Sequence, residues 1–186
     1  MLDAATEAYR RYLDGETAQF DYIIEAYREN LIFYIQRYVH NLADAEDLAM
    51  DAFADLIIHP KRYRFGSSLK TYLFSIGAHK AIDFLRKRRR EVTYDGDALA
   101  RMSAEEETLA EHVIKNERAR ALLAAIDRLP EDYRNAVYLV YFEEMSYAEA
   151  GRVLGKSEKQ INNLCYRAKG ALRQHLEKGG FSHAES

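Results

Sequence analysis

The sequence predicts an all-α protein of two small helical domains joined by an acidic linker, the C-terminal domain being a helix-turn-helix. Apolar residues recur at spacings of three and four along most of the 186 residues, which is the mark of amphipathic helices. Only nine glycines and two prolines leave too few turn signals for a many-stranded β architecture. Charge is also segregated along the chain, although the net charge is only −3.

This charge segregation points to a polyanionic partner. Residues 61–90 carry a net charge of +9 and residues 146–178 carry +4, whereas residues 1–60 carry −8 and residues 91–117 carry −6. Basic patches concentrated on short elements are the electrostatic footprint of a nucleic-acid partner. The five cations at residues 86–90 could instead form a solvated helix end that faces the negative C-terminal dipole.

Composition excludes several classes of protein. A single cysteine, Cys165, rules out an internal disulfide and a multi-thiolate metal site. No run approaches the ~18 apolar residues of a membrane span, and the N-terminus lacks the form of a signal peptide, so we expect a cytoplasmic chain without membrane insertion. The six histidines lack ligand spacing and no glycine-rich phosphate loop occurs. We therefore expect no metal, no cofactor and no enzyme.

Three helices are predicted for the first domain, residues 1–91. The first covers Phe20–Val39, where apolar residues follow helical spacing. The second runs from about Asp44 to His59 and stops at Pro60, because the residue before a proline disfavours the helical region. The third begins near Ser67 or Ser68 and continues into the arginine run.

A partly helical acidic linker is predicted for residues 92–117. Tyr94–Asp97 has the composition of a turn, and three glutamates follow at residues 105–107. Ser103 with Glu106 could cap a short helix there. At the other end of the chain, residues 179–186 are expected to be a flexible tail.

The second domain, residues 118–178, is predicted to open with two short helices. Leu122, Leu123, Ile126 and Leu129 form the apolar face of the first. Pro130 suits the first position of the next helix, because a backbone N–H there would have no hydrogen-bond partner within the helix. The apolar residues 137–142 could be misread as a strand, but the proline start favours a helix.

The sharpest local signal is a helix-turn-helix at residues 146–173. Ser146 and Glu149 form a capping box, and Ser157 with Gln160 repeats the device eleven residues later. Between them, Gly155 can take the left-handed conformation that ends a helix. Two helices joined by such a short glycine-containing turn are a helix-turn-helix.

The second helix of this motif has the composition of a recognition helix. Its apolar side includes Ile161, Cys165 and Ala168, and Cys165 is better explained by packing than by reactivity. The exposed side would carry amides and cations suited to base edges and phosphates. These residues are Lys159, Gln160, Asn162, Asn163, Tyr166, Arg167 and Lys169. A plain helical hairpin with a polar outer face is the alternative.

An acidic stripe runs along the helix at residues 44–59. Asp44, Asp47, Asp51 and Asp55 are spaced by three or four residues and so share one face. Like charges at this spacing destabilise an isolated helix by a few tenths of a kcal/mol per pair. A basic partner surface would explain the stripe, and an ordinary solvated face is the alternative.

Residues 61–73 interleave cations with aromatic residues ahead of a Gly-Ser-Ser loop. Tyr63, Phe65 or Tyr72 could stack on bases while the neighbouring Arg and Lys side chains hold the backbone. The loop could also hold a flipped base through its hydroxyl and N–H groups. Tyr72 could instead belong to the core.

At these positions the chain resembles the extracytoplasmic-function sigma factors of bacterial RNA polymerase. The similarity covers about residues 8–176. Four motifs carry it in chain order: Asp44-Ala45-Glu46-Asp47-Leu48 with Phe53; Phe65-Gly66-Ser67-Ser68 before Thr71-Tyr72-Leu73; Leu129-Pro130-Glu131 before Tyr133-Arg134; and Ser146-Tyr147-Ala148-Glu149 through Leu154-Gly155, Ser157 and Tyr166-Arg167-Ala168-Lys169.

The resemblance implies a factor that binds core RNA polymerase and directs promoter recognition and DNA melting. Its partners would be core polymerase, promoter DNA as duplex and as melted single strand, and an anti-sigma factor. Core polymerase would contact Asp44, Glu46, Asp47 and Asp51. The minus-ten element would contact Arg62, Tyr63, Arg64, Phe65, Gly66, Ser67, Ser68, Lys70, Tyr72, His79 and Arg86. The minus-thirty-five element would contact Lys156, Ser157, Lys159, Gln160, Asn163, Tyr166 and Arg167.

A free-standing helix-turn-helix regulator with an unrelated ligand-binding N-terminal domain is the alternative function. It would bind duplex DNA tightly by itself and would have no affinity for polymerase.

Overall fold

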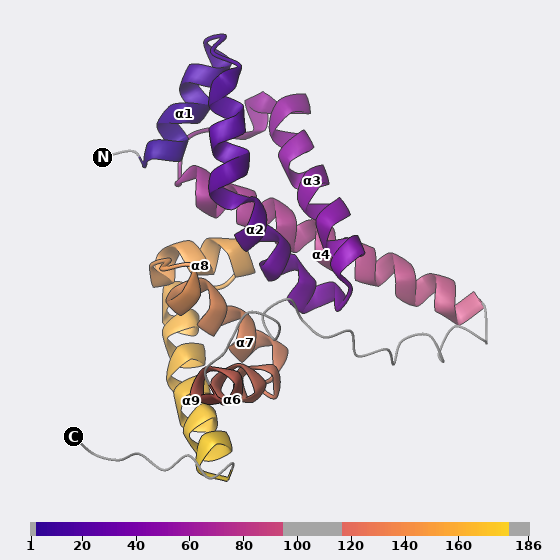
Figure 1. Cartoon of the computed structure of the whole chain (residues 1–186), viewed down its shortest axis with the longest axis vertical. Coiled ribbons are helices and arrows are strands. Elements are labelled where there is room, and N and C mark those ends of the chain that lie inside the picture. The colour runs from indigo at the N-terminus through magenta and orange to yellow at the C-terminus, as the bar shows by residue number, and fades with distance from the viewer. Residues whose placement is uncertain (1–2, 95–116, 179–186) are drawn as a thin grey trace. The chain divides into compact units, whose positions relative to one another are not determined.

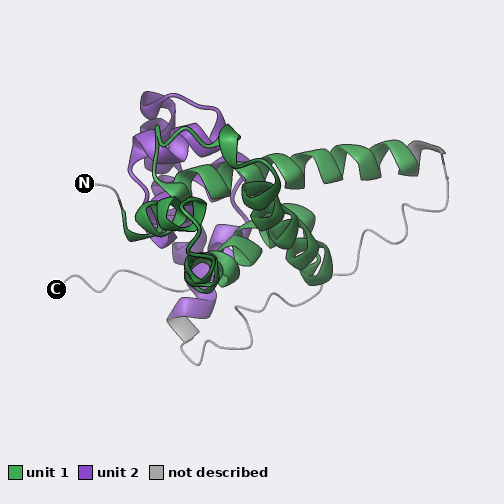
Figure 2. Ribbon diagram, turned by 90° about the horizontal axis from the view of Figure 1, so that it is seen from above, with its two compact units in different colours: residues 1–106 green, residues 107–186 purple. Residues whose placement is uncertain are grey.

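Every regular element in the described part of the chain is a helix, as predicted. The computed structural model describes residues 3–94 and 117–178 (Figure 1). The chain divides into two compact units, residues 1–106 (unit 1) and residues 107–186 (unit 2), which Figure 2 colours separately. None of the described helices combines the length and the apolar character needed to cross a bilayer.

In its described residues, unit 1 is a bundle of four helices built around α2. They are α1 (Ala4–Leu13), α2 (Ala18–Val39), α3 (Leu42–Ile58) and α4 (Leu69–Tyr94), with a short 3-10 turn at Pro60–Arg62. α2 packs against the other three helices, and α3 also packs against α4. The C-terminal part of α4, which carries the arginine run, extends beyond the other helices of the unit (Figure 1).

The three helices predicted for the first domain are present, with shifted ends. α3 begins two residues before Asp44, because the Asn41 side chain caps it by accepting a hydrogen bond from the Asp44 N–H at 2.9 Å. α4 continues to Tyr94, three residues past the predicted end of the first domain at residue 91. Residues 95–116, with the proposed Ser103–Glu106 cap, and the tail at 179–186 lie outside the described residues.

The first helix of the bundle, α1, was not predicted. Asp3 caps it by accepting a hydrogen bond from the Thr6 N–H at 2.8 Å. Ala5, Ala8 and Tyr9 are buried against the rest of unit 1. An N-cap aspartate followed by apolar residues at spacings of three and four is a signal that the sequence does contain.

The described part of unit 2, residues 117–178, contains four α-helices and one π-helical segment. They are α6 (Glu117–Asp127), α7 (Glu131–Val137), the π-helical turn Tyr138–Phe142, α8 (Tyr147–Leu154) and α9 (Glu158–Lys178). Its core joins Ile126, Leu129, Val137 and Ala168. α9 packs against α6, α7 and α8 and so spans the whole unit.

Two details of the predicted second domain are wrong. Leu122 is 39% exposed instead of lying on the buried face, because α6 turns Leu123 and Ile126 toward the core. Pro130 has ψ 145° and is the N-cap of α7, one residue before the predicted position. The segment at residues 137–142 is helical as predicted, but from Tyr138 to Phe142 it has π geometry, with the Glu143 N–H donating to the Tyr138 carbonyl at 3.1 Å.

Candidate functional site

The helix-turn-helix of unit 2 is built from two capping boxes, as the sequence predicted. Glu149 N–H donates to Ser146 Oγ at 3.2 Å while Ser146 N–H donates to Glu149 Oε2 at 2.9 Å. Ser157 and Gln160 repeat this exchange at the start of α9, with distances of 2.7 Å and 3.3 Å. Gly155 ends α8 in the left-handed conformation, with φ of 64°.

A second glycine, Gly151 in α8, shapes the turn, and the sequence analysis did not predict this. A Cβ placed on it would lie 2.5 Å from the Lys156 carbonyl oxygen. Lys156 N–H donates to the Gly151 carbonyl at 2.9 Å, so the turn folds tightly back on α8 at this point. Only a residue without a side chain allows this approach.

α9 presents the predicted polar face. Ile161, Cys165 and Ala168 are buried toward the core, and burial raises the pKa of the Cys165 thiol. On α9, five of the predicted contact residues are exposed, Tyr166 at 80%: Lys159, Gln160, Asn163, Tyr166 and Arg167. This face therefore combines amide, aromatic and cationic groups on one solvent-facing side of a helix.

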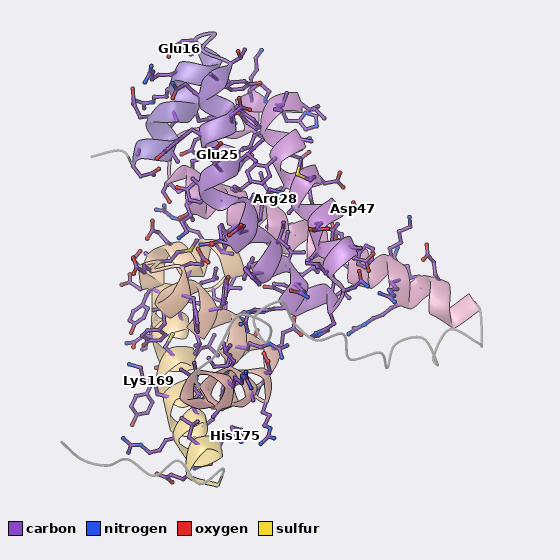
Figure 3. The ribbon with its side chains drawn as sticks, viewed as in Figure 1. Glu16, Glu25, Arg28, Asp47, Lys169 and His175 are labelled. Atoms are coloured by element: carbon purple, nitrogen blue, oxygen red, sulfur yellow. The ribbon has the colours of Figure 1, made fainter. Side chains whose placement is uncertain are left out.

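Lys156 in the turn and Gln160 on α9, both predicted contacts, have partners within the chain. Lys156 is half-buried, and its Nζ lies 3.3 Å from Asp132 Oδ2. The Gln160 side-chain oxygen is used by the cap on Ser157. On the neighbouring surface, the Lys169 ammonium lies 4.9 Å from the Tyr141 ring centroid, and the Tyr141 hydroxyl raises the pKa of Lys169 (Figure 3).

The acidic stripe of α3 divides into paired and exposed members. Asp44 Oδ2 lies 3.5 Å from an Arg88 guanidinium nitrogen, and Asp55 Oδ2 lies 3.2 Å from Lys80 Nζ. Both cations belong to α4, so α4 neutralises the two ends of the stripe. Asp47 and Asp51 lie between them.

The central part of the stripe faces solvent. Asp47 and Asp51 are exposed, and neither forms an ion pair with another described residue. Figure 3 labels Asp47 on α3. Glu46 is half-buried, and Met50, between the two aspartates, is 47% exposed. Carboxylates beside an exposed apolar side chain form a surface suited to a protein partner with basic character.

The aromatic loop before α4 is not the open stacking surface that the sequence suggested. Tyr63 is only 5% exposed, and its hydroxyl donates to the Ser67 carbonyl at 2.6 Å. Its ring stacks on Tyr72 with centroids 4.9 Å apart. A base cannot reach the Tyr63 ring, so in this conformation Tyr63 packs the loop, and its assignment to DNA contact stays a prediction.

Phe65 carries the unusual backbone conformation of the loop. Its φ is 55°, in the left-handed region that non-glycine residues rarely adopt, whereas the neighbouring Gly66 is not in that region. The half-buried Phe65 ring packs 4.6 Å from that of Tyr63, and the Arg10 guanidinium lies 4.8 Å above it. The loop is thus held by packing on both sides of Phe65.

The remaining predicted minus-ten residues lie in the loop or on α4. Ser68 caps α4 by accepting a hydrogen bond from the Thr71 N–H at 3.2 Å. Four of these residues are half-buried: Ser67, Ser68, Lys70 and Tyr72. Five are exposed: Arg62, Arg64, Gly66, His79 and Arg86.

Part of the charge on α4 is balanced within the chain. Arg86 pairs with Asp83 at 3.1 Å, and His79 Nδ1 lies 2.6 Å from the Ser75 carbonyl oxygen. The exposed cations nevertheless extend from the loop along the projecting part of α4. Among residues 3–94 and 117–178, no group of three or more His, Cys, Asp or Glu side chains gathers as a metal site would require.

Both units match known protein families. Residues 23–91 match Sigma-70 region 2, and residues 119–172 match Sigma-70, region 4. The ECF RNA polymerase sigma factor SigM of Bacillus subtilis is 27% identical over 159 residues, which are 86% of this chain and 96% of that protein.

Two solved structures share the fold. The sigma factor RpoE, solved with the anti-sigma factor NepR from Bartonella quintana, superposes with a TM-score of 0.69 at 24% identity, covering 85% of this chain and 96% of that one. CnrH, solved with the cytosolic domain of CnrY, gives a TM-score of 0.67 at 20% identity, covering 95% and 99%.

Proposed function

Because this chain belongs to the extracytoplasmic-function sigma factors of the sigma-70 family, whose task is promoter recognition, we propose which of its surfaces perform that task. The observation that carries the proposal is that both regions lie in one chain in the order 2 then 4, each within its own helical unit. A free-standing regulator would not need region 2. The chain catalyses no reaction of its own and acts in the cytoplasm through the polymerase.

The exposed centre of the α3 acidic stripe binds core RNA polymerase. Asp47 and Asp51 supply the charge, since both face solvent without an ion-pair partner among the described residues, and Glu46 and Met50 border them. Asp44 contributes less than expected from sequence, because Arg88 already neutralises it. Complementary charge across such an interface favours correct orientation and fast association.

The loop before α4 and the cationic side of α4 bind the minus-ten element as it melts. Phe65, Gly66, Ser67 and Ser68 offer an aromatic edge, backbone groups and hydroxyls to an unstacked base. Exposed cations hold the sugar-phosphate backbone. They are Arg62 and Arg64 at the loop and Arg86 on α4, where the half-buried Lys70 and the exposed His79 also lie.

The polar face of α9 reads the minus-thirty-five element in the major groove of duplex DNA. Lys159, Gln160 and Asn163 lie in its first two turns, where a recognition helix reaches base edges. Tyr166 and Arg167 follow, and Arg167 is placed to contact a base or a phosphate. Ser157 and Lys156 border the face at the turn.

An anti-sigma factor is the proposed regulatory partner. The structural relatives RpoE and CnrH were solved with partner proteins, NepR and the cytosolic domain of CnrY respectively. This chain shares their fold and exposes the surfaces on which such a partner would compete with polymerase or DNA.

The test of the polymerase surface is a pair of charge reversals. Asp47→Lys with Asp51→Lys should abolish capture of core polymerase by the tagged chain, because two repulsions replace two attractions. Asp21→Lys with Glu25→Lys is the matched control, since both residues are exposed, four apart and on α2, another helix of unit 1. Equal capture by wild type and the Asp47/Asp51 variant, with circular dichroism unchanged, would refute the assignment.

Start-site mapping tests the function as a whole. Core polymerase mixed with the chain should initiate at a defined set of promoters in a genomic library, and core polymerase alone should not. The sequences upstream of those starts would supply the minus-ten and minus-thirty-five elements for the binding experiments below. A set of starts identical with and without the chain would overturn the proposal.

A further inference from the structure

Thr6 on α1 is tied to the loop that precedes α4, although 63 residues separate it from the start of that helix. Its hydroxyl accepts a hydrogen bond from the Leu69 N–H at 2.8 Å and donates to Asp3 Oδ2 at 2.7 Å. The Thr6 side chain is fully buried. Leu69 is the first residue of α4, so Thr6 satisfies an amide that has no partner within its own helix.

The same hydroxyl meets the loop at a second point. Tyr63 Oη lies 3.4 Å from Thr6 Oγ1 and donates to the Ser67 carbonyl at 2.6 Å. The chain of contacts therefore runs from Asp3 through Thr6 to both ends of the loop, Tyr63 and Leu69. Buried polar networks of this kind fix one geometry when every member is satisfied.

α1 also holds Phe65 in its left-handed conformation. The Tyr9 ring packs 6.4 Å from the Phe65 ring, and the Arg10 guanidinium covers the ring at 4.8 Å. Left-handed backbone at a non-glycine residue persists only where its surroundings enforce it. Here the enforcing groups come from Tyr63 and from α1, which precedes the residues that match region 2.

We propose that α1 sets the loop at residues 63–69 in its DNA-binding shape before DNA arrives, with Thr6 as the positioning residue. The inference rests on the proposed function, in which this loop captures an unstacked minus-ten base. A loop that samples several shapes binds in proportion to the fraction in the competent shape, so presetting raises the apparent affinity for single-stranded DNA. Thr6 touches no DNA and acts through Tyr63, Leu69 and the loop backbone.

The first test replaces Thr6 in the full chain and measures the assembled holoenzyme. Thr6→Val keeps the shape and removes the hydroxyl, and Thr6→Ser restores the hydroxyl. The probe is a labelled single-stranded oligonucleotide with the non-template minus-ten sequence of a promoter found by start-site mapping. Thr6→Val should bind it about fivefold more weakly, the effect of losing a hydrogen bond to a buried amide. Thr6→Ser should bind near the wild-type level.

Capture of core polymerase distinguishes a role of Thr6 in positioning the loop from a role only in the stability of unit 1. The α3 acidic stripe belongs to the same unit, so Thr6→Val should capture core polymerase as wild type does at a temperature below its unfolding. Equal oligonucleotide affinity for Thr6→Val and wild type would overturn the inference while leaving the proposed function intact. Parallel loss of both activities would also overturn it, because Thr6 would then only stabilise the unit. A wild-type holoenzyme that binds no oligonucleotide would instead refute the loop's proposed function.

If Thr6→Val does not fold, a second pair of variants tests whether the hydrogen bonds of the loop set its DNA-binding shape. Tyr63→Phe removes only the hydroxyl that holds the Ser67 carbonyl, and Tyr34→Phe removes a buried hydroxyl that lies 2.8 Å from Tyr38 Oη elsewhere in the unit. Tyr63→Phe should lower oligonucleotide affinity while Tyr34→Phe leaves it unchanged. Equal affinities for the two variants would overturn the inference.

Discussion

Gly151→Ala should destabilise the helix-turn-helix, although alanine is the better helix former. The new Cβ would lie 2.5 Å from the Lys156 carbonyl oxygen, whereas real Cβ atoms essentially never come closer than 3.0 Å. The backbone at Lys156 must therefore move away. That movement stretches the hydrogen bonds that Gly155 N–H and Lys156 N–H donate to the Gly151 carbonyl, the latter at 2.9 Å.

Three contributions determine how much stability Gly151→Ala loses, two of them unfavourable and one favourable. Forcing a methyl group into a packed site costs about 1–3 kcal/mol. Weakening the hydrogen bonds of the turn adds about 0.5–1.5 kcal/mol. The higher helix propensity of alanine returns about 1 kcal/mol. The net loss is about 0.5–3.5 kcal/mol, which corresponds to local opening about 2 to 400 times more frequent.

Hydrogen exchange of the full chain measures this opening directly. Peptides that cover α8 and the start of α9 should lose protection in Gly151→Ala. Gly170→Ala is the matched control, because it makes the same substitution on α9 with no atom within 4 Å of the new Cβ. It should increase protection by about 0.5–1 kcal/mol, the helix preference for alanine over glycine. Changes of the same sign in both variants would refute the argument from close approach.

Three further predictions concern single side chains. Arg167→Ala should weaken holoenzyme binding to minus-thirty-five duplex and reduce the salt slope by about one if Arg167 contacts a phosphate; unchanged affinity and slope would contradict both roles. Burial raises the pKa of Tyr9 from its ordinary value of 10.0 to about 12, so the folded state keeps a proton that the unfolded state loses. Stability should then fall between pH 10 and about 12, and urea titrations of Tyr9→Phe should show a smaller fall; an identical fall would exclude Tyr9 as its source. Asp55→Asn should cost less than about 1 kcal/mol in urea unfolding at low salt and less still at high salt, because its pair with Lys80 is partly exposed. A larger, salt-independent loss would argue against this estimate.

The features that the sequence predicted well depend on residues close together in the chain. The capping boxes at Ser146 and Ser157 are exchanges between residues three apart, and both are present. The polar face of α9 follows from helical spacing alone. α1 could have been predicted in the same way from Asp3 and the apolar residues after it, because its cap is also a contact over three residues.

The features that could not be predicted depend on contacts between distant residues. Tyr63 is an aromatic residue among cations, a pattern that predicts base stacking. Only its packing against Tyr72 and its hydrogen bond to Ser67 identify it as buried. The requirement for glycine at residue 151 arises from where the chain returns after the turn. Hydrophobic spacing contains neither kind of information, since it fixes which face is buried and not which neighbour covers it.

Charge in the sequence overstates the charge available to partners. The acidic first segment and the basic second one fold into the same unit, where Arg88 and Lys80 of α4 neutralise Asp44 and Asp55 of α3. A charge already paired within the chain must lose that partner before it can bind another, so its net contribution to association is smaller.

Pairing within the chain also decides how much each cation of the turn and of the recognition helix contributes to DNA binding. Lys156 pairs with Asp132 at 3.3 Å, whereas Lys159 is exposed and has no ion-pair partner among the described residues. In binding to minus-thirty-five duplex, Lys159→Ala should therefore lower affinity and salt dependence more than Lys156→Ala does. Because the ion pair with Asp132 keeps Lys156 from binding DNA, Asp132→Ala should strengthen duplex binding through Lys156. In that background, Lys156→Ala should lower affinity more than Lys159→Ala does. If Lys156→Ala has the larger effect while Asp132 is present, the pairing within the chain does not govern which cations reach DNA.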